Sequence, residues 1–104
     1  MRLDQFTVKA QEAITAAQGI ASRYAHQQLE PEHLLGAMLE EAKGIPVSVI
    51  KKIGADPDAL REDLQALLEG KPKVYGGDSS RVFLSPAIES VFRKAEDEMR
   101  AFRD

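Results

Sequence analysis

The chain contains no cysteine among its 104 residues, so it can form no disulfide framework and no thiolate metal site. No stretch approaches the roughly 18 consecutive apolar residues of a membrane-spanning helix, and residues 1–5 lack the apolar run of a secretion signal. The lysines are scattered and the net charge is −3, which argues against binding to a nucleic-acid phosphate backbone. The sequence therefore predicts one small domain with neither a nucleic-acid nor a membrane partner.

Motifs for nucleotide binding and for nucleophilic catalysis are missing as well. Gly70-Lys71 is followed by proline and lacks the upstream glycine of a phosphate-binding loop, and no G-x-S-x-G elbow is present. The two histidines, His26 and His33, do not have the H-E-x-x-H spacing that places two imidazoles on one helical face. We therefore expect no catalytic residue, no metal and no cofactor in this chain. We also expect His33 to be a packed structural histidine and His26 to lie at the surface.

The sequence is rich instead in the signals that build helices. Apolar residues recur at three- and four-residue intervals, and proline or a capping side chain stands before most of these stretches. The pattern predicts an all-α fold with helices near residues 7–24, 31–42, 46–53, 57–69 and 86–103. Gly44, Gly54 and Gly70 are expected to end three of these helices. A brief pairing of residues 74–75 with residues 82–84 is the one strand contact that the sequence suggests.

The first and last predicted helices follow one pattern at a constant spacing. An apolar and a hydroxyl residue open each of them, at residues 6–7 and 84–85, and an aromatic residue closes each, at Tyr24 and Phe102. Such a long period suggests a domain of two repeats whose second copy is incomplete. We expect a first repeat of four helices over residues 1–70, a linker loop over 71–84, and the first helix of the second repeat over 85–104.

The segment LEPEHLL at residues 29–35, together with Phe6-Thr7 and Ala10 upstream, resembles the Clp amino-terminal repeat domain. That module heads the ring-shaped AAA+ unfoldases and disaggregases. Four segments resemble the ClpB type of disaggregase in particular: residues 1–7, 44–46, 53–57 and 82–85. The resemblance extends over essentially the whole chain and implies the helical fold of a Clp double-repeat domain.

The resemblance implies a function within a longer parent protein. It implies the N-terminal substrate-binding domain of an ATP-dependent disaggregase chaperone, which engages unfolded or aggregated polypeptides. The domain would deliver them to the parent's own AAA+ ring, expected to be a hexamer in the cytoplasm. ATP and Mg²⁺ would belong to the parent, and the chain itself is expected to be no enzyme. The alternative is the adaptor-docking domain of a protease-coupled unfoldase of the ClpA or ClpC type.

The resemblance also implies roles for individual residues. Thr7, Phe92 and Asp104 match positions that the family assigns to substrate binding, and Ile14 is the counterpart of Phe92 in the first repeat. Glu32 matches a contact with phospho-arginine in ClpC relatives, which makes it a candidate contact for an adaptor or a modified peptide. The structural alternatives are that Thr7 caps the first helix, that Phe92 belongs to the core and that Glu32 stabilises a helix start.

Helical geometry gives a more specific expectation for Phe92. Successive residues of a helix are turned by about 100° around its axis, so Phe92 lies away from the line defined by Ile88, Val91 and the apolar residues that follow. Ile14 is similarly displaced from the alanine line of the first helix. We therefore expect Phe92 to form the exposed wall of a groove rather than the centre of the core.

Overall fold

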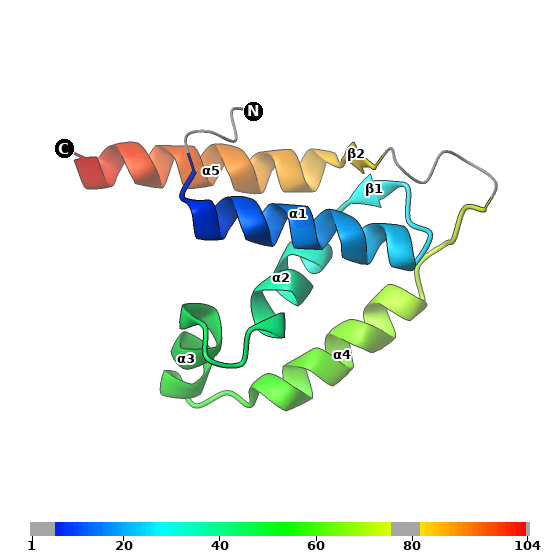
Figure 1. The fold of residues 1–104 in the computed structure, drawn as a ribbon, viewed down its shortest axis with the longest axis horizontal. Coiled ribbons are helices and arrows are strands. Elements are labelled where there is room, and N and C mark those ends of the chain that lie inside the picture. The colour runs from blue at the N-terminus through cyan, green and yellow to red at the C-terminus, as the bar shows by residue number, and fades with distance from the viewer. Residues whose placement is uncertain (1–5, 76–81, 104) are drawn as a thin grey trace.

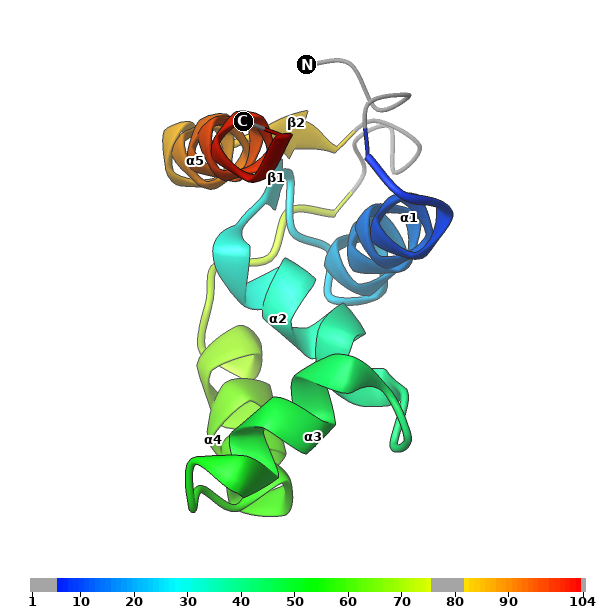
Figure 2. The ribbon, with the colours of Figure 1, turned by 90° about the vertical axis from the view of Figure 1, so that its left-hand side faces the viewer.

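The computed structural model describes residues 6–75 and 82–103. Its elements are α1 (Val8–Arg23), β1 (Gln28–Leu29), α2 (Pro31–Glu40), α3 (Ile45–Lys52), α4 (Pro57–Glu69), β2 (Phe83–Leu84) and α5 (Pro86–Arg103). Figure 1 and Figure 2 show α1 and α5 at one end of the molecule, α3 and α4 at the other, and α2 between them. The predicted all-α fold is confirmed, and the ends of the five helices differ from the predicted ones by at most two residues.

The first and last helices begin with the same local geometry. The hydroxyl oxygen of Thr7 accepts a hydrogen bond from the backbone N–H of Ala10 at 3.1 Å, and that of Ser85 accepts one from Ile88 at 3.1 Å. These caps satisfy amide groups that the first turn of a helix leaves without a partner. The sequence similarity between the two helices is therefore matched by their cap geometry.

Two helices end in the same hydrogen-bonded turn, built on different residues. After α1, His26 N–H bonds to Ala21 and Ala25 N–H bonds to Ser22, while Ala25 adopts the left-handed conformation with φ 59°. After α3, the equivalent bonds surround Gly54, whose φ is 88°. This is the Schellman turn, in which glycine avoids the steric cost that a Cβ atom imposes. The expected stop at Gly54 is confirmed, whereas the turn after α1 carries the strain of an alanine.

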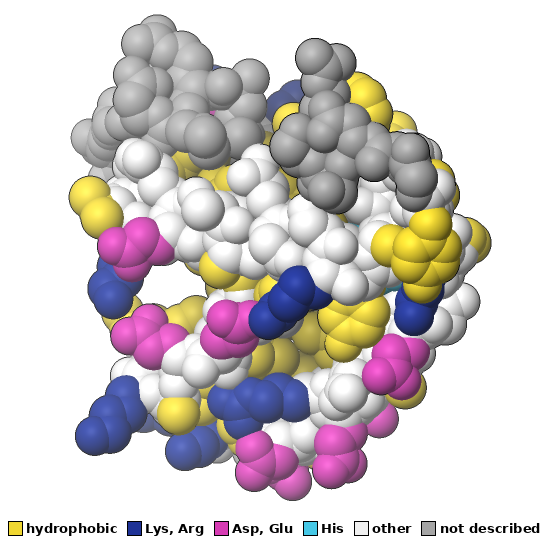
Figure 3. Space-filling view, turned by 45° about the vertical axis from the view of Figure 1, so that its right-hand side comes forward, with side chains coloured by type: hydrophobic (Ala, Val, Ile, Leu, Met, Phe, Trp, Pro, Cys, Tyr) yellow, Lys and Arg dark blue, Asp and Glu magenta, His cyan; other side chains and the backbone are white. Residues whose placement is uncertain are grey.

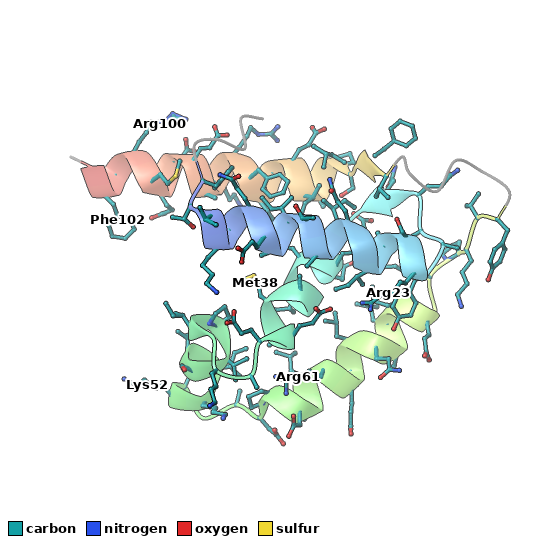
Figure 4. The ribbon with its side chains drawn as sticks, in the orientation of Figure 1. Arg23, Met38, Lys52, Arg61, Arg100 and Phe102 are labelled. Atoms are coloured by element: carbon teal, nitrogen blue, oxygen red, sulfur yellow. The ribbon has the colours of Figure 1, made fainter. Side chains whose placement is uncertain are left out.

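The end of α2 differs from the prediction, and Arg61 explains why. The guanidinium of Arg61, on α4, donates from Nε and Nη2 to the carbonyl oxygen of Leu39 at 3.0 and 2.7 Å, and Figure 4 shows this side chain between α4 and α2. These bonds satisfy a carbonyl that the end of the helix leaves unpaired. The chain then turns away at Glu41, and Gly44 forms the N-cap of α3 instead of ending α2. The expectation for Gly44 was therefore wrong.

The strand contact also differs from the prediction. Gln28 and Leu29 pair in parallel with Phe83 and Leu84, so residues 82–84 find their partner in the connection after α1 rather than in residues 74–75. The backbone N–H of Val74 donates instead to the carbonyl of Ala25 at 2.8 Å. This short pairing places the start of α5 beside the start of α2.

Helix α2 is the centre of the fold. It packs against α1, α3, α4 and α5, most extensively against α1. The largest fully buried side chains come from several elements and the turns between them: Leu29, Leu39, Ile88, His33, Val47 and Ser85. In the described residues no helix has both the length and the apolar character needed to cross a membrane.

The two Schellman turns allow a matched test of backbone strain. Because only glycine enters the left-handed region without a steric cost, Ala25→Gly should raise the free energy of unfolding by up to about 1 kcal/mol. Gly54→Ala, at the same position of the other turn, should lower it by about the same amount. Chemical denaturation of both variants measures the effect, and a destabilised Ala25→Gly protein would contradict the explanation.

Candidate functional site

The structure places Phe92 in the core, which contradicts the expectation of an exposed groove wall. Only 4% of Phe92 is accessible to solvent, and its ring lies 6.2 Å from that of Phe6 between centroids. The prediction was wrong because it placed the buried side of α5 along Ile88, Val91 and the apolar residues that follow them. Ile88 and Phe92 are four residues apart, hence only about 40° apart around the helix, and this pair faces inward. Val91 is turned about 60° from Ile88 in the other direction, away from Phe92, and 37% of it is exposed.

The outer edge of α5 consequently carries exposed Val91 and Phe102 and half-buried Ala95, beside exposed Glu98. Val91, Ala95 and Phe102 fall within about 40° of one another around the helix axis, and we call them the α5 stripe. Phe102 is 88% exposed, and Figure 4 shows it projecting from the last turn of the helix. Exposed apolar side chains along one edge of a helix offer a surface to which apolar segments of other chains can bind. The α5 stripe, rather than Phe92, is the exposed candidate surface of this helix.

The other residues expected to bind substrate differ from one another in their exposure. Ile14 is buried in the same core cluster as Phe92, so the equivalence between the two positions extends to their burial. Thr7 is exposed at the start of α1, where its oxygen accepts the capping bond. Its hydroxyl proton remains able to donate to an incoming acceptor. Asp104 lies outside the described residues.

Glu32 is engaged in an ion pair. Its carboxylate lies 2.9 Å from the ammonium group of Lys71, and both side chains are about three-quarters buried. Glu32 is also in the first turn of α2, where a negative charge interacts favourably with the helix dipole. A guanidinium-like ligand at Glu32 would therefore have to displace Lys71.

The two histidines form a buried hydrogen-bonded pair. His26 Nδ1 lies 2.8 Å from His33 Nε2, and the ring of Tyr24 stacks on that of His26. The predicted packed position of His33 is confirmed, but the expected surface position of His26 is wrong, since both rings are buried. The turn at Ala25 causes the difference, because it directs the next residue back toward the core. Sequence spacing alone gave no sign of this contact.

A backbone amide determines where the protons of this pair lie. Glu30 N–H donates to His33 Nδ1 at 2.9 Å, so a neutral His33 carries its proton on Nε2 and donates it to His26 Nδ1. His26 then carries its proton on Nε2, which is buried and forms no hydrogen bond of good geometry among the described residues, although the backbone of Leu68 is near enough to favour a proton there. A second proton on either ring would place two N–H groups against each other.

Burial accordingly disfavours the charged form of both rings. Loss of solvent, followed by the charge of His26, lowers the pKa of His33 to about 4. Loss of solvent also lowers the pKa of His26, with smaller contributions from Lys71 and Lys73. The backbone of Leu68 acts in the opposite direction on His26. The pair is therefore neutral at physiological pH and suits a structural role.

A small hollow opens between α1, α2 and α4. It has a volume of about 240 Å³ and includes the buried side chains of Ile20, Leu64 and Leu68 in its lining. Arg23 and Glu40 also line it and approach each other to 3.4 Å; the space-filling view shows charged side chains around an apolar interior (Figure 3). The hollow is smaller than the pockets of roughly 300–1,000 Å³ that hold cofactors or drug-sized ligands. In the described ranges, no three His, Cys, Asp or Glu side chains are grouped as a metal site.

Residues 5–104 match the family described as the Clp repeat (R) N-terminal domain. The chain belongs to this family. Among its relatives, the chaperone protein ClpB of Bacillus cereus is 34% identical over the whole chain, and that of Nitratidesulfovibrio vulgaris is 33% identical over the whole chain. ClpB 1 of Synechococcus elongatus is 35% identical over 97% of the chain. The chain spans only 12% of the length of the first two of these relatives and 11% of the third.

Within this Clp repeat domain, the candidate residues fall into two groups. Thr7 and the α5 stripe belong to the end formed by α1 and α5, together with buried Ile14 and Phe92. Glu32 belongs to the start of α2, next to the histidine pair. Sequence analysis missed the α5 stripe as an exposed surface, although its regular spacing was visible, because the buried side of the helix was wrongly assigned.

The histidine pair should make the domain sensitive to acid. The unfolded chain binds a proton at His33 near pH 6.5, whereas the folded chain does so only near pH 4. Stability from this group is therefore complete above about pH 6.5 and is lost as the pH falls toward 4, by on the order of 1.4 kcal/mol for each unit of pKa difference. Denaturation midpoints measured between pH 7.5 and 4 give this slope.

His33→Gln is the matched control for the acid sensitivity. Glutamine at this third helical position can still accept the Glu30 N–H bond, as in a capping box, but it does not titrate. This variant should show a shallower loss of stability between pH 6.5 and 4. An unchanged slope would mean that carboxylates, not the histidine pair, dominate the acid response.

Proposed function

We propose that this chain is the N-terminal substrate-binding domain of a ClpB-like, ATP-dependent disaggregase chaperone. The observation that carries the proposal is the family match over residues 5–104, with ClpB proteins as relatives over the whole chain. The domain would bind unfolded or aggregated polypeptide and deliver it to the parent's AAA+ ring, a hexamer in the cytoplasm. In this proposal the nucleotide chemistry, with ATP and Mg²⁺, belongs to the ring.

The α5 stripe supports this proposal as the surface that contacts substrate. Unfolded polypeptides expose apolar side chains that folded proteins bury, and Val91, Ala95 and Phe102 offer an apolar strip without a demand for one sequence. Thr7 can add a hydrogen bond to a substrate carbonyl through its hydroxyl proton. Binding of this kind would be weak and tolerant of sequence, as a chaperone requires.

The buried residues then have a supporting role. Ile14 and Phe92 hold α1 and α5 in the common core, so they would influence substrate binding through the position of the stripe rather than by contact. The domain organisation is part of the same proposal: residues 1–70 form one Clp repeat, 71–84 a linker, and 85–104 the first helix of a second repeat. Glu32 would act as an additional contact for an adaptor or a modified peptide once Lys71 is displaced.

Substitutions at Phe102 and Phe92 test the proposal together. Phe102→Ser removes an exposed ring, so it should weaken binding of a fluorescently labelled unfolded polypeptide while leaving the melting temperature nearly unchanged. Phe92→Ala removes a buried ring and should cost about 3–5 kcal/mol of stability. Fluorescence anisotropy and thermal unfolding, measured on the same samples, separate the two effects.

Tyr75→Ser serves as the control, because Tyr75 is an exposed aromatic residue outside α5. It should bind the unfolded polypeptide as the unmodified chain does. If Phe102→Ser binds as tightly as Tyr75→Ser, the α5 stripe is not the substrate surface. Loss of binding in both variants would indicate nonspecific adhesion to exposed rings.

A further inference from the structure

The hollow between α1, α2 and α4 is lined by a glycine that the fold itself does not require. Gly36 lies in the middle of α2, where a glycine makes a helix less stable than an alanine would. Its φ is not positive. A Cβ atom at Gly36 would lie 3.4 Å from the terminal methyl carbons of Ile20 and Leu64, which are flexible enough to accommodate it. The clearest effect of the missing side chain is therefore to keep the hollow open.

The hollow has room for one side chain that carries a ring. Its volume is about 240 Å³, whereas an apolar cavity of about 150 Å³ is enough to hold a benzene molecule. Four aliphatic side chains in its lining are more than nine-tenths buried: Ile20, Leu39, Leu64 and Leu68. A ring that enters the hollow would therefore exchange water for an apolar surface that is already formed.

The charged groups that line the hollow are paired. Arg23 and Glu40 approach each other to 3.4 Å. Arg61 contacts Asp58 at 2.6 Å and donates its other N–H groups to the carbonyl of Leu39. The formal charges of the two arginines and the two carboxylates sum to zero, so the rim favours an uncharged ligand.

Other charged residues nearby do not change this balance. On α4, Glu62, Asp63 and Glu69 are turned by about 80–160° from Arg61 around the helix axis, and none of them lines the hollow. On α1, Glu12 lies about 16 Å along the helix from Arg23. Lys71, after the end of α4, is paired with Glu32 at 2.9 Å.

Flat polar groups at the rim favour an aromatic ligand over an aliphatic one. Arg23, Tyr24 and Arg61 all line the hollow, and Figure 4 shows Arg23 extending from α1 toward α4 and Arg61 from α4 toward α2. A guanidinium group stacks on the face of an aromatic ring, and a tyrosine ring packs against another ring. An aliphatic side chain would gain neither interaction.

We infer that the hollow is a pocket for a single aromatic side chain, presented by an uncharged peptide segment of a partner protein. The ring would lie against Ile20 and Leu64 in the space that Gly36 leaves, with the guanidinium of Arg23 over its face. The pocket lies on other helices than the α5 stripe and selects one type of residue. It therefore goes beyond the sequence-tolerant binding proposed for α5 and does not depend on it.

Four blocked peptides test the chemistry of the ligand. Each has neutral Gly and Ser flanks around one central residue, which is Phe, Leu, Ala or Lys. The methyl signals of Ile20, Leu64 and Leu68 are followed by NMR during titration. The Phe peptide should shift these signals most strongly and saturably, the Leu peptide less, and the Ala and Lys peptides hardly at all. Equal responses to Phe and Lys, or a response confined to Val91 on α5, would overturn the inference.

Two glycine substitutions separate binding from stability. Gly36→Ala should raise the denaturation midpoint, because alanine favours a helix. It should also weaken the Phe peptide about tenfold, the low end of the range of roughly 10- to 200-fold for one carbon group in an apolar pocket. Gly19→Ala is the matched control, since Gly19 lies within α1, does not line the hollow and has no atom within 4 Å of its Cβ position. It should raise the midpoint without affecting the peptide. Equal affinities in the two variants would reject the pocket.

A further variant tests the aromatic preference. Arg23→Lys keeps a positive charge beside Glu40 but removes the planar group. It should weaken the Phe peptide and leave the Leu peptide unchanged. An equal loss for both peptides would mean that Arg23 does not recognise the ring, and the aromatic assignment would fail.

The remaining occupant to test is a second copy of the chain, which itself exposes Tyr75, Phe83 and Phe102. Light scattering should give a constant monomer mass over the concentrations used for NMR. A mass that rises with concentration, and does not rise in Gly36→Ala, would assign the pocket to a second copy and overturn the inference.

Phe102→Ser separates this inference from the proposed function. This variant should bind the Phe peptide in the hollow as the unmodified chain does. Loss of the shifts at Ile20 and Leu64 in Phe102→Ser would overturn the separate pocket. If the peptide results hold while Phe102→Ser still binds unfolded polypeptide normally, the proposed role of α5 fails alone.

Discussion

The buried hydrogen bond between His26 and His33 is the contact on which the arrangement of the helices depends. It joins the turn after α1 to the first turn of α2. The same short stretch of chain supplies β1, which pairs with β2 and so places the start of α5. A backbone amide assigns the protons of both rings, so only the neutral pair satisfies this geometry. The strained turn at Ala25 is tolerated because it brings His26 to this position.

Local signals in the sequence were sufficient to predict the helices, but not the contact between the end of α1 and the start of α2. Thr7, Asp56 and Ser85 each accept the hydrogen bond expected of a capping residue, because capping involves residues only two or three positions apart. His26 was wrongly predicted to lie at the surface because its burial depends on the left-handed conformation of Ala25. A glycine at this position would have indicated that conformation, whereas an alanine does not. Gly44 was misassigned because Arg61, from another helix, ends α2 first. One error arose from a rare backbone conformation and the other from a contact with a residue that is distant in the sequence.

In the candidate site, too, the local pattern was predictable and the long-range packing was not. The apolar arc of α5 was correctly recognised, yet periodicity does not say which part of a broad arc faces inward. The ring of Phe6, from the segment before α1, packs near Phe92 and helps to settle that choice in favour of burial. Val91 and Phe102 consequently lie at the exposed edge. The family resemblance drew attention to this helix, but the roles that it implies for single residues depend on how those residues pack in this chain.

Helix α2 connects the two ends of the molecule. Helices α3 and α5 both pack against it, and α2 is held by the histidine pair at its start and by Arg61 at its end. Packed interiors transmit displacement only when they have a second stable arrangement. Because α2 is fixed at both ends, a ligand bound at one end of the molecule has no alternative core packing to select. Binding at one end should therefore leave the other end unchanged, and acid, which opposes the neutral histidine pair, is the condition that would loosen both ends together.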